Sequence, residues 1–282
     1  MATIHEDYRT LFPMKTDSEP IANALLRSLL ESPLLIDDLL EAPSFSRSHL
    51  ALPDPKPAFN LQQKLGHLYE DALAILLRES PTLDLLKENL QIRKDIHTTI
   101  GELDFLLREK STGNLIHLEL ATKFYLAVDT WDGLTLPGPD ARDNYHRKLT
   151  RLRNHQLTLS SRFPDHLPET YRNESIETKQ LIYGCLFDHI HGDQLANPEF
   201  ISPTCRRGRW LHQYELSSYF PKETQFHLIP KYLWPVPFNL LTDIPLESWQ
   251  PDEPIDRCLM IHAGDDPTPY FIAPDSYPKF NS

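Results

Sequence analysis

A chain of 282 residues with 40% hydrophobic and 24% charged residues is long enough to bury a large core, and this composition excludes an intrinsically disordered protein. Its formal net charge of −12 excludes a general nucleic-acid coat protein, because phosphate binding needs an electropositive surface, although a local basic groove remains compatible with it. The cysteines Cys185, Cys205 and Cys258 lack C-x-x-C spacing, which predicts free thiols rather than a zinc site or a disulfide framework. The start, MATIHEDYRTLFP, lacks the basic-then-apolar order of a signal peptide, and no run of about 18 apolar residues exists, so we expect a cytoplasmic protein without a membrane segment.

Residues 1–60 are predicted to form an N-terminal helical extension. Apolar residues recur at helical spacing from Pro20 to Leu40, and Pro33 is expected to divide this stretch into two helices, because proline removes an interior hydrogen bond. Ala42–Phe59 is rich in Pro and Ser, which is typical of a connecting loop.

Residues 61–190 are predicted to form the central unit of an α/β fold. The unit begins with the clearest helix of the chain, Leu61–Glu79, and Glu70 lies at the edge of the apolar face of that helix. A residue in this position is most often a solvated flank. The short segment Leu90–His97 is predicted to be a strand.

The next segment predicts a β-hairpin with a loop longer than two residues, because two apolar runs, Leu103–Leu107 and Leu115–Leu120, flank a turn-like stretch. Three ionisable residues stand where a strand pattern expects apolar ones, namely Asp104, Glu119 and Lys123. A carboxylate within an apolar strand is costly unless it is paired or binds a cation. These three residues are therefore the candidate active site.

The segment Asp140–Leu159 predicts a basic helix. Its cations are interleaved with aromatic residues, and the set includes Arg142, Tyr145, Arg147, Lys148, Arg151 and Arg153. A charge run of this kind is most often a solvated face, and the alternative is a surface that contacts nucleic-acid phosphates. Gln180–Phe187 then predicts a buried strand, which makes the order of elements helix, three strands, helix, strand. Residues 191–282 are predicted to be a C-terminal region packed on this core, with irregular structure from Pro221 onward.

The hairpin predicts a metal site. Side chains alternate with period two in a strand, so Asp104 and Glu119 are expected to come close across the ladder, with Lys123 on the same face as Glu119. Two carboxylates at that separation repel each other unless a cation lies between them, and hard oxygen ligands suit Mg²⁺ or Mn²⁺. Such a metal polarises a phosphoryl oxygen and lowers the pKa of a bound water, while a nearby lysine balances phosphate charge.

This constellation resembles the PD-(D/E)XK phosphodiesterase superfamily, which has a restriction-endonuclease-like fold. GELDFLL supplies the Asp of the second strand, HLELATKFYL supplies the acid and lysine of the third, and Glu70 matches a helix glutamate found in many members. More narrowly, the chain is similar to the DUF1853 group, on the motifs KLGHLYE, GELDFLL, HLELATKFYLA and RGRWLHQYEL. The resemblance implies a restriction-endonuclease-like core in which Asp104, Glu119 and Glu70 hold the metal and Lys123 takes part in catalysis.

The chain departs from the superfamily pattern at one position, and this departure leaves two functional hypotheses open. The lysine is expected two residues after the acid, where this chain has Ala121, and Lys123 follows four residues after Glu119. An extended lysine reaches about 6 Å, close to the ~6.6 Å that two further strand residues span. The leading hypothesis is a Mg²⁺- or Mn²⁺-dependent DNA nuclease, with Glu70, Asp104, Glu119 and Lys123 as catalytic residues.

In the same hypothesis Tyr145, Arg147, Lys148 and Arg151 of the basic helix contact DNA. The alternative is a catalytically degenerate member that binds nucleic acid or regulates a partner, in which a cation such as Lys123 or Arg93 pairs with Asp104. An enzyme for small phosphorylated molecules has no support, because there is no glycine-rich phosphate loop.

Four further residues carry weaker signals. Glu102 is more often an exposed residue at a strand start than a second ligand. His189 and His191 have a spacing found in metal sites, but they follow a strand in a loop. Trp210 is expected to be a core anchor rather than a platform for base stacking.

Overall fold

The computed structural model describes residues 18–192 and 195–278. The N-terminal segment for which the sequence predicts no signal peptide lies outside these residues. The described α-helices are α1 (Ser18–Glu31), α2 (Leu65–Arg78), α3 (Tyr145–Asn154), α4 (Leu159–Arg162) and α5 (Leu216–Tyr219). The strands are β1 (Leu34–Ile36), β2 (Leu83–Arg93), β3 (Thr99–Glu109), β4 (Leu115–Leu126), β5 (Val128–Thr130), β6 (Gly133–Thr135), β7 (Ile176–His189), β8 (Arg206–His212), β9 (Phe226–Leu228), β10 (Glu247–Trp249), β11 (Leu259–Ala263) and β12 (Tyr270–Ala273).

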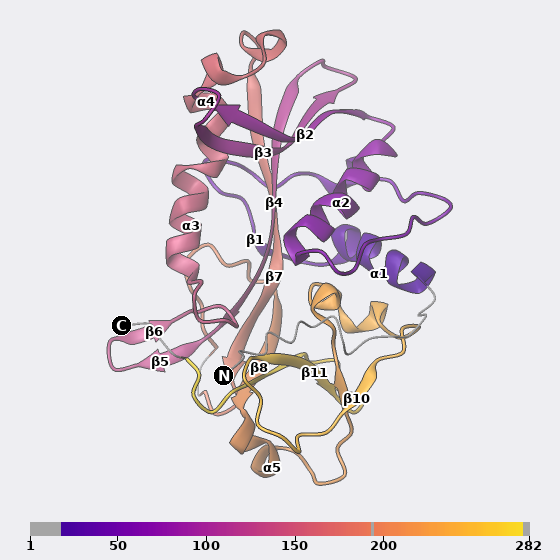
Figure 1. The fold of residues 1–282 in the computed structure, drawn as a ribbon, viewed down its shortest axis with the longest axis vertical. Coiled ribbons are helices and arrows are strands. Elements are labelled where there is room, and N and C mark those ends of the chain that lie inside the picture. The colour runs from indigo at the N-terminus through magenta and orange to yellow at the C-terminus, as the bar shows by residue number, and fades with distance from the viewer. Residues whose placement is uncertain (1–17, 193–194, 279–282) are drawn as a thin grey trace.

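The fold is mixed α/β and is built on one ten-stranded sheet (Figure 1). Nine strands follow the order β10-β9-β11-β12-β8-β7-β4-β3-β2, and β1 pairs with β7 outside this path. Strands β2, β3 and β4 form an antiparallel meander, whereas β4, β7, β8 and β12 run parallel to their neighbours in that order. The predicted succession of helix, three strands, helix and strand is present as α2, β2, β3, β4, α3 and β7, with the small β5–β6 hairpin inserted before α3.

Helices cover both faces of the central strands, and alternation along β4 assigns its side chains to one face or the other. Leu118 and Phe124 belong to the apolar core shared with α1 and α2. Tyr125 and Ala127 pack instead into the core shared with α3. Figure 1 shows α3 on one side of β4 and β7, and α1 and α2 on the other. The strand that carries Glu119 is therefore enclosed between two helical layers.

The pairing of β4 with β7 depends on a glycine. The two strands are parallel over all 12 residues of β4, and Lys123 lies opposite Gly184. Gly184 has φ +153°, and a Cβ atom at this position would lie 1.7 Å from the carbonyl oxygen of Lys123. Because no side chain can occupy that space, only glycine allows the two backbones to approach this closely.

The segment from Pro20 to Leu40 differs from its prediction. A single helix, α1, ends at Glu31, and after Pro33 the chain forms β1 rather than a second helix. Leu34 and Ile36 pair with Tyr183 and Ile182 of β7, so the apolar residues of this stretch are buried against the sheet. The first predicted helix is thus present as α1, and only the apolar spacing after Pro33 reflects burial on the sheet rather than a helical face. The loop predicted over Ala42–Phe59 is present, apart from a short 3₁₀ turn at Arg47–His49.

Two other boundaries were predicted wrongly. The strand expected at Leu90–His97 begins earlier, at Leu83, and ends at Arg93, where a turn closes with Lys94 N–H donating to the Thr98 carbonyl. The basic helix is shorter than Asp140–Leu159, because the side chain of Asn144 accepts hydrogen bonds from the first amides and caps the helix one residue before Tyr145. It ends at Asn154, and a 3₁₀ turn at residues 156–158 leads into α4.

The C-terminal region is ordered as part of the main sheet, and the prediction of irregular structure from Pro221 was wrong. Strands β9, β10, β11 and β12 extend the sheet beyond β8, and β12 lies between β8 and β11. Trp210 is confirmed as a core anchor, since only 3% of it is exposed and its indole N–H donates to the Ala127 carbonyl. The three cysteines are free and buried. Within the described ranges, no helix combines the length and the apolar character needed to cross a bilayer.

Candidate active site

The two predicted carboxylates meet where β3 and β4 separate. Pairing between these strands ends at Phe105 and Leu118, and the next residue on each strand is acidic. The N–H of Leu120 donates to Asp104 Oδ2 at 2.8 Å, and the N–H of Asp104 donates to Glu119 Oε1 at 3.3 Å. Each carboxylate thus accepts from a backbone amide that would otherwise be left without a strand partner. The prediction that Asp104 and Glu119 come close across the hairpin is confirmed.

Glu119 is held on its other side by His117 and Gln156, and His117 in turn contacts Ser160; none of the three was predicted as a site residue. His117 Nε2 lies 2.7 Å from Glu119 Oε1, and the side-chain amide of Gln156 donates to Oε2 at 3.3 Å. The other ring nitrogen of His117 lies 3.2 Å from the hydroxyl of Ser160. Burial lowers the pKa of His117 to about 3, so its imidazole is neutral. Glu119 therefore lies in a dense hydrogen-bonded environment and is only 2% exposed.

The charge balance of the pair is unfavourable to two ionised carboxylates. Burial raises the pKa of Asp104, and the adjacent Glu119 charge raises it further. Burial also raises the pKa of Glu119. The hydrogen bond from the Asp104 amide lowers this pKa, whereas the charges of Glu70 and Glu102 raise it further. Among the described residues, no lysine or arginine forms an ion pair with either acid. The pair therefore favours binding either a proton or a metal cation.

Glu70 and Lys123, the other two predicted catalytic residues, lie beside the pair without contacting it. Glu70 on α2 accepts a hydrogen bond from His67 Nδ1 at 3.0 Å, and this contact raises the pKa of the histidine. The ammonium group of Lys123 lies 3.8 Å from Asp143 Oδ2. Burial lowers the pKa of Lys123, while Asp143 opposes this effect. Lys123 does not pair with Asp104, and Arg93 donates to Gln91 instead.

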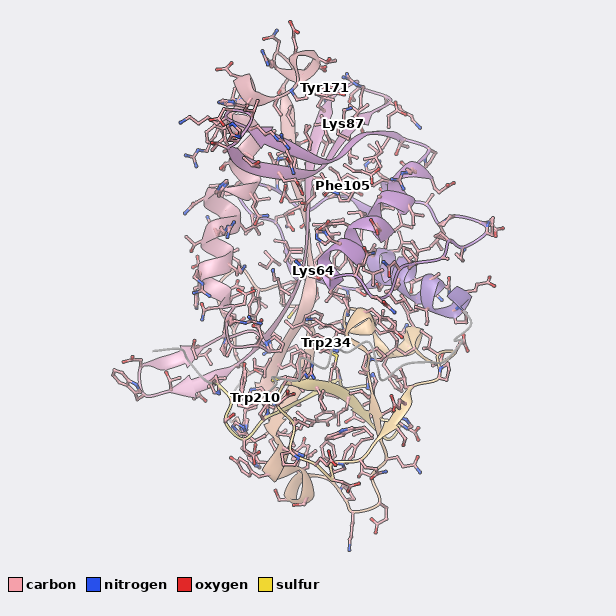
Figure 2. All side chains as sticks on the ribbon, viewed as in Figure 1. Lys64, Lys87, Phe105, Tyr171, Trp210 and Trp234 are labelled. Carbon is pink, nitrogen blue, oxygen red and sulfur yellow. The ribbon has the colours of Figure 1, made fainter. Side chains whose placement is uncertain are left out.

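A cleft of about 1830 Å³ adjoins the carboxylate pair. Glu70, Leu120 and Gln156 line it, whereas Asp104 and Glu119 lie just behind its wall. The cleft also carries several cations, which come from α2, β4, α3 and the C-terminal region: Lys64, Lys123, Arg142, Lys148, Arg151, Lys231 and Arg257. Lys64 and Trp234, on the α2 side and the C-terminal side of the cleft, are labelled in Figure 2. Carboxylates line it as well, and the three aspartates among them pair with these cations: Glu70, Asp140, Asp143, Glu247 and Asp256. The cleft is therefore mixed in charge with a small excess of cations, which suits an anionic ligand that reaches a bound metal.

The residues predicted to contact DNA from α3 have different surroundings. Lys148 and Arg151 line the cleft, and within the described part of the chain neither forms an ion pair. Arg147 lies outside the cleft and donates to the Arg142 carbonyl. The guanidinium group of Arg153 forms an ion pair with the carboxylate of Glu41 at 2.7 Å.

Tyr145, the fourth residue predicted to contact DNA, lies at the cleft wall but is almost fully buried. It is 1% exposed, and its hydroxyl donates to the Glu199 carbonyl, so its ring serves as packing beneath the helix.

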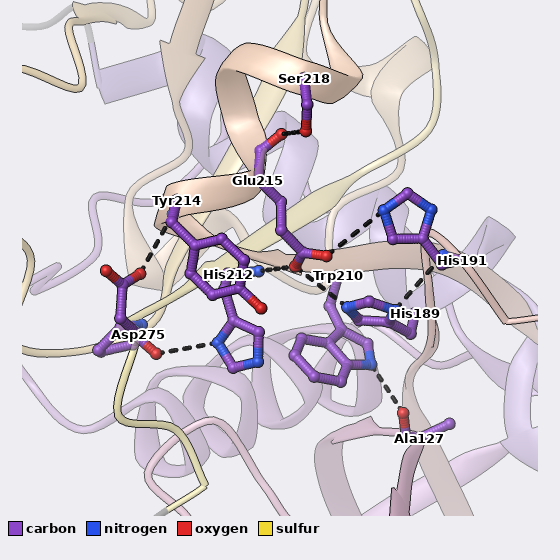
Figure 3. A network of polar contacts seen from close by, with 10 residues as sticks. Ala127, His189, His191, Trp210, His212, Tyr214, Glu215, Ser218 and Asp275 are labelled. Carbon is purple, nitrogen blue, oxygen red and sulfur yellow. Dashed lines mark hydrogen bonds and ion pairs between the residues drawn. The ribbon is translucent and has the colours of Figure 1, made fainter.

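The two histidines of the DHIHGD stretch belong to a separate polar network, drawn in Figure 3. His189 Nε2 and His191 Nε2 lie 3.2 Å and 3.4 Å from the carboxylate of Glu215, which also accepts from the His212 amide. Burial lowers the pKa of His189. Across the residues that the structure describes, no three His, Cys, Asp or Glu side chains are arranged to hold a metal ion, here or at the carboxylate pair.

One known protein family matches most of the chain. The model of a family described as a domain of unknown function, DUF1853, matches residues 16–273. The chain belongs to the DUF1853 family. Neither the curated proteins nor the solved structures contain a match to it. In the DUF1853 chain, KLGHLYE opens α2, GELDFLL lies in β3, HLELATKFYLA covers β4, and RGRWLHQYEL begins in β8. Three of these four stretches thus supply the candidate site.

The pKa shifts of the pair predict how the stability of the DUF1853 chain depends on pH. Raised pKa values mean that the folded state binds protons more tightly than the unfolded state, so this contribution to stability is greatest at low pH and declines as pH rises. We expect the free energy of unfolding, measured by urea titration without metal, to fall more from about pH 5 to about pH 8 in the wild type than in an Asp104→Asn/Glu119→Gln double variant. Equal pH dependence in both proteins would contradict the assigned shifts.

Proposed function

We propose that the DUF1853 chain is a Mg²⁺- or Mn²⁺-dependent phosphodiesterase that cleaves DNA and has a PD-(D/E)XK-like core. The observation that carries the proposal is the adjacent pair of a partly buried Asp104 and a buried Glu119, with which no lysine or arginine among the described residues forms an ion pair. The pair adjoins a cleft that Lys123, Lys148 and Arg151 line. The order α2, β2, β3, β4, α3, β7 agrees with the core that the resemblance implies. The donor chemistry fits in kind, since carboxylate oxygens are the ligands that Mg²⁺ and Mn²⁺ prefer.

Each residue then has a defined role. Asp104 and Glu119 would hold the metal, and Glu70, at the cleft wall, would complete its surroundings directly or through water. The metal would polarise the phosphoryl oxygen and lower the pKa of an attacking water. Lys123 lines the same cleft as Glu70 and would balance the charge that develops on the phosphate. To do so, its ammonium group must exchange Asp143 for the substrate, and a contact of 3.8 Å between two partly exposed side chains is weak enough to permit this.

Metal binding tests the proposal without any assumption about the substrate. Titration calorimetry with Mn²⁺ on the wild type, Asp104→Ala and Glu119→Ala should show binding in the wild type alone. A matched control is Asp143→Ala, because this carboxylate also lines the cleft but pairs with Lys123. Absence of binding by the wild type would refute the proposal.

The cations of α3 predict how the cleft engages DNA. Lys148→Ala and Arg151→Ala each remove a positive charge from the cleft wall, so we expect DNA affinity to fall and the dependence of log K on log salt concentration to become shallower by about one per charge. Arg147→Ala, on the same helix but outside the cleft, is the matched control and should change neither quantity. Fluorescence anisotropy with labelled DNA, at several salt concentrations and without metal, measures both.

A non-cleaving, DNA-binding role is the second candidate, and the position of Lys123 favours it. The lysine is displaced along β4 relative to the superfamily pattern and is paired with Asp143. In this case DNA would still bind through Lys148 and Arg151, but no Mn²⁺-dependent cleavage would be detected. A nuclease assay on single-stranded, duplex and branched DNA, with Asp104→Ala prepared in parallel, distinguishes the two candidates.

A further inference from the structure

Two buried polar residues, His117 and Ser160, and the partly buried Gln156 surround Glu119 but have no part in the proposed reaction. His117, on the same strand, is 0% exposed, and Ser160, on α4, is 3% exposed. Gln156 precedes α4 in the 3₁₀ turn and reaches the same carboxylate. Burying an imidazole, a hydroxyl and a carboxylate together is costly unless they satisfy one another, so the contacts between them require an explanation.

The directions of these hydrogen bonds follow from what each group can donate. When Glu119 binds a metal it is ionised and only accepts, so in that state the 2.7 Å contact requires the proton of a neutral His117 to be on Nε2. Nδ1 is then an acceptor, and the Ser160 hydroxyl, 3.2 Å away, must donate to it. The serine on α4 therefore selects the tautomer of a histidine on β4, in the way that a distant partner orients a histidine in many metal sites.

The two oxygens of Glu119 consequently differ. Oε1 accepts from both His117 Nε2 and the Asp104 amide, which fills its two lone-pair sites. Oε2 accepts from Gln156 alone, at 3.3 Å, and retains an open site. On Asp104, Oδ2 accepts from the Leu120 amide. The carboxylate of Glu119 is thus fixed with one oxygen saturated and the other available.

We propose that His117, oriented by Ser160, is a positioning residue that locks Oε1 of Glu119 and so directs Oε2 toward the divalent cation. This inference rests on the proposed function, because it concerns the same metal site. His117 does not contact the cation or the substrate, and it acts only through Glu119. Its contribution is to prevent the carboxylate from rotating away from the orientation that binding requires.

Two amide substitutions at His117 separate positioning from packing. His117→Gln places an amide N–H near the position of Nε2 and can still donate to Glu119, whereas His117→Asn retains only a group near Nδ1. We expect His117→Asn to weaken Mn²⁺ binding by about 10- to 100-fold and His117→Gln to stay within about 3-fold of the wild type. His146→Asn, at an exposed position on α3, is the control and should bind like the wild type.

The outcomes distinguish this inference from the proposed function. If the wild type binds no Mn²⁺, both fail together. If the wild type binds Mn²⁺ but His117→Asn binds equally well, or both amide variants lose affinity to the same extent, only the positioning role fails. Urea unfolding of each variant shows whether it is folded. If His117→Asn does not fold, ¹⁵N NMR of histidine-labelled wild type with saturating Mg²⁺ decides: the Nε2–H tautomer of His117 is expected, and the Nδ1–H tautomer would overturn the inference.

Discussion

Replacing Asp104 by asparagine is expected to abolish Mn²⁺-dependent cleavage and, at the same time, to stabilise the metal-free protein. Under the proposed function, cleavage should fall at least about a thousandfold, because Asp104 would be a charged metal ligand whose loss removes several kcal/mol of transition-state stabilisation. Above about pH 8, where both acids lose their protons, stability should rise by about 1 to 3 kcal/mol, because the variant removes one of two adjacent like charges. The side-chain carbonyl of the asparagine can still accept from the Leu120 amide, and the backbone N–H of residue 104 still donates to Glu119.

These opposite effects make the prediction specific to a metal site. A residue that only supports the fold would lose stability on substitution, and any loss of cleavage would follow from unfolding. Glu102→Gln, two residues earlier on β3, is the matched control, because it also removes a carboxylate near the pair but should leave cleavage within about 3-fold of the wild type. Cleavage assays and urea unfolding at fixed pH measure both quantities. An Asp104→Asn protein that cleaves like the wild type would refute the assignment.

The second large effect is expected at Gly184, where alanine should destabilise the protein by about 4 kcal/mol or more. The added Cβ would overlap the carbonyl oxygen of Lys123, a backbone atom that cannot move without disrupting the pairing of β4 with β7. We expect the melting temperature to fall by roughly 10 °C and metal affinity to decline, since Glu119 lies on the distorted strand.

Gly66→Ala provides the matched control for Gly184→Ala. Gly66 is exposed in the first turn of α2, and a Cβ there would meet Glu70 Oε1 at an ordinary 3.7 Å. Alanine favours the helix over glycine, so this variant should gain about 0.5 to 1 kcal/mol. Thermal unfolding of the two variants beside the wild type tests both. A Gly184→Ala protein as stable as the wild type would show that the strands are farther apart than described.

Local sequence patterns predicted the parts of the fold that depend on neighbouring residues. The helical spacing in α2 and the apolar runs around the 110–114 turn gave the helix and the hairpin, because the residues that define them are close in sequence. The strands from β8 onward pair with segments far away along the chain, as Tyr270 does with Arg209. Most of these strands are short and lie between prolines, so their sequences show no periodicity. The apolar residues of β12 are the exception, because an apolar run of this length can indicate a buried strand.

The candidate site likewise contains some residues that the local sequence predicts and others that only the folded chain brings together. Asp104 and Glu119 were predictable because they interrupt apolar strands, and the same signal was present at His117, two residues before Glu119. Its importance depends on Ser160, which lies on α4 and reaches His117 only in the folded chain. The burial of Tyr145 was also beyond sequence reasoning, because its hydroxyl partner, the Glu199 carbonyl, follows β7.

The position of β12 within the sheet has a consequence for how the protein is made. As the chain leaves the ribosome, β8 emerges well before β12, the strand that must cover its edge. At about 5 to 20 residues per second, that edge stays without its partner for several seconds, and an uncovered edge is the part of a sheet most prone to pair with other chains. Slow translation between β8 and β12, or a truncation before β12, should therefore increase aggregation during synthesis. We expect chaperone binding to matter most while this part of the chain is being made.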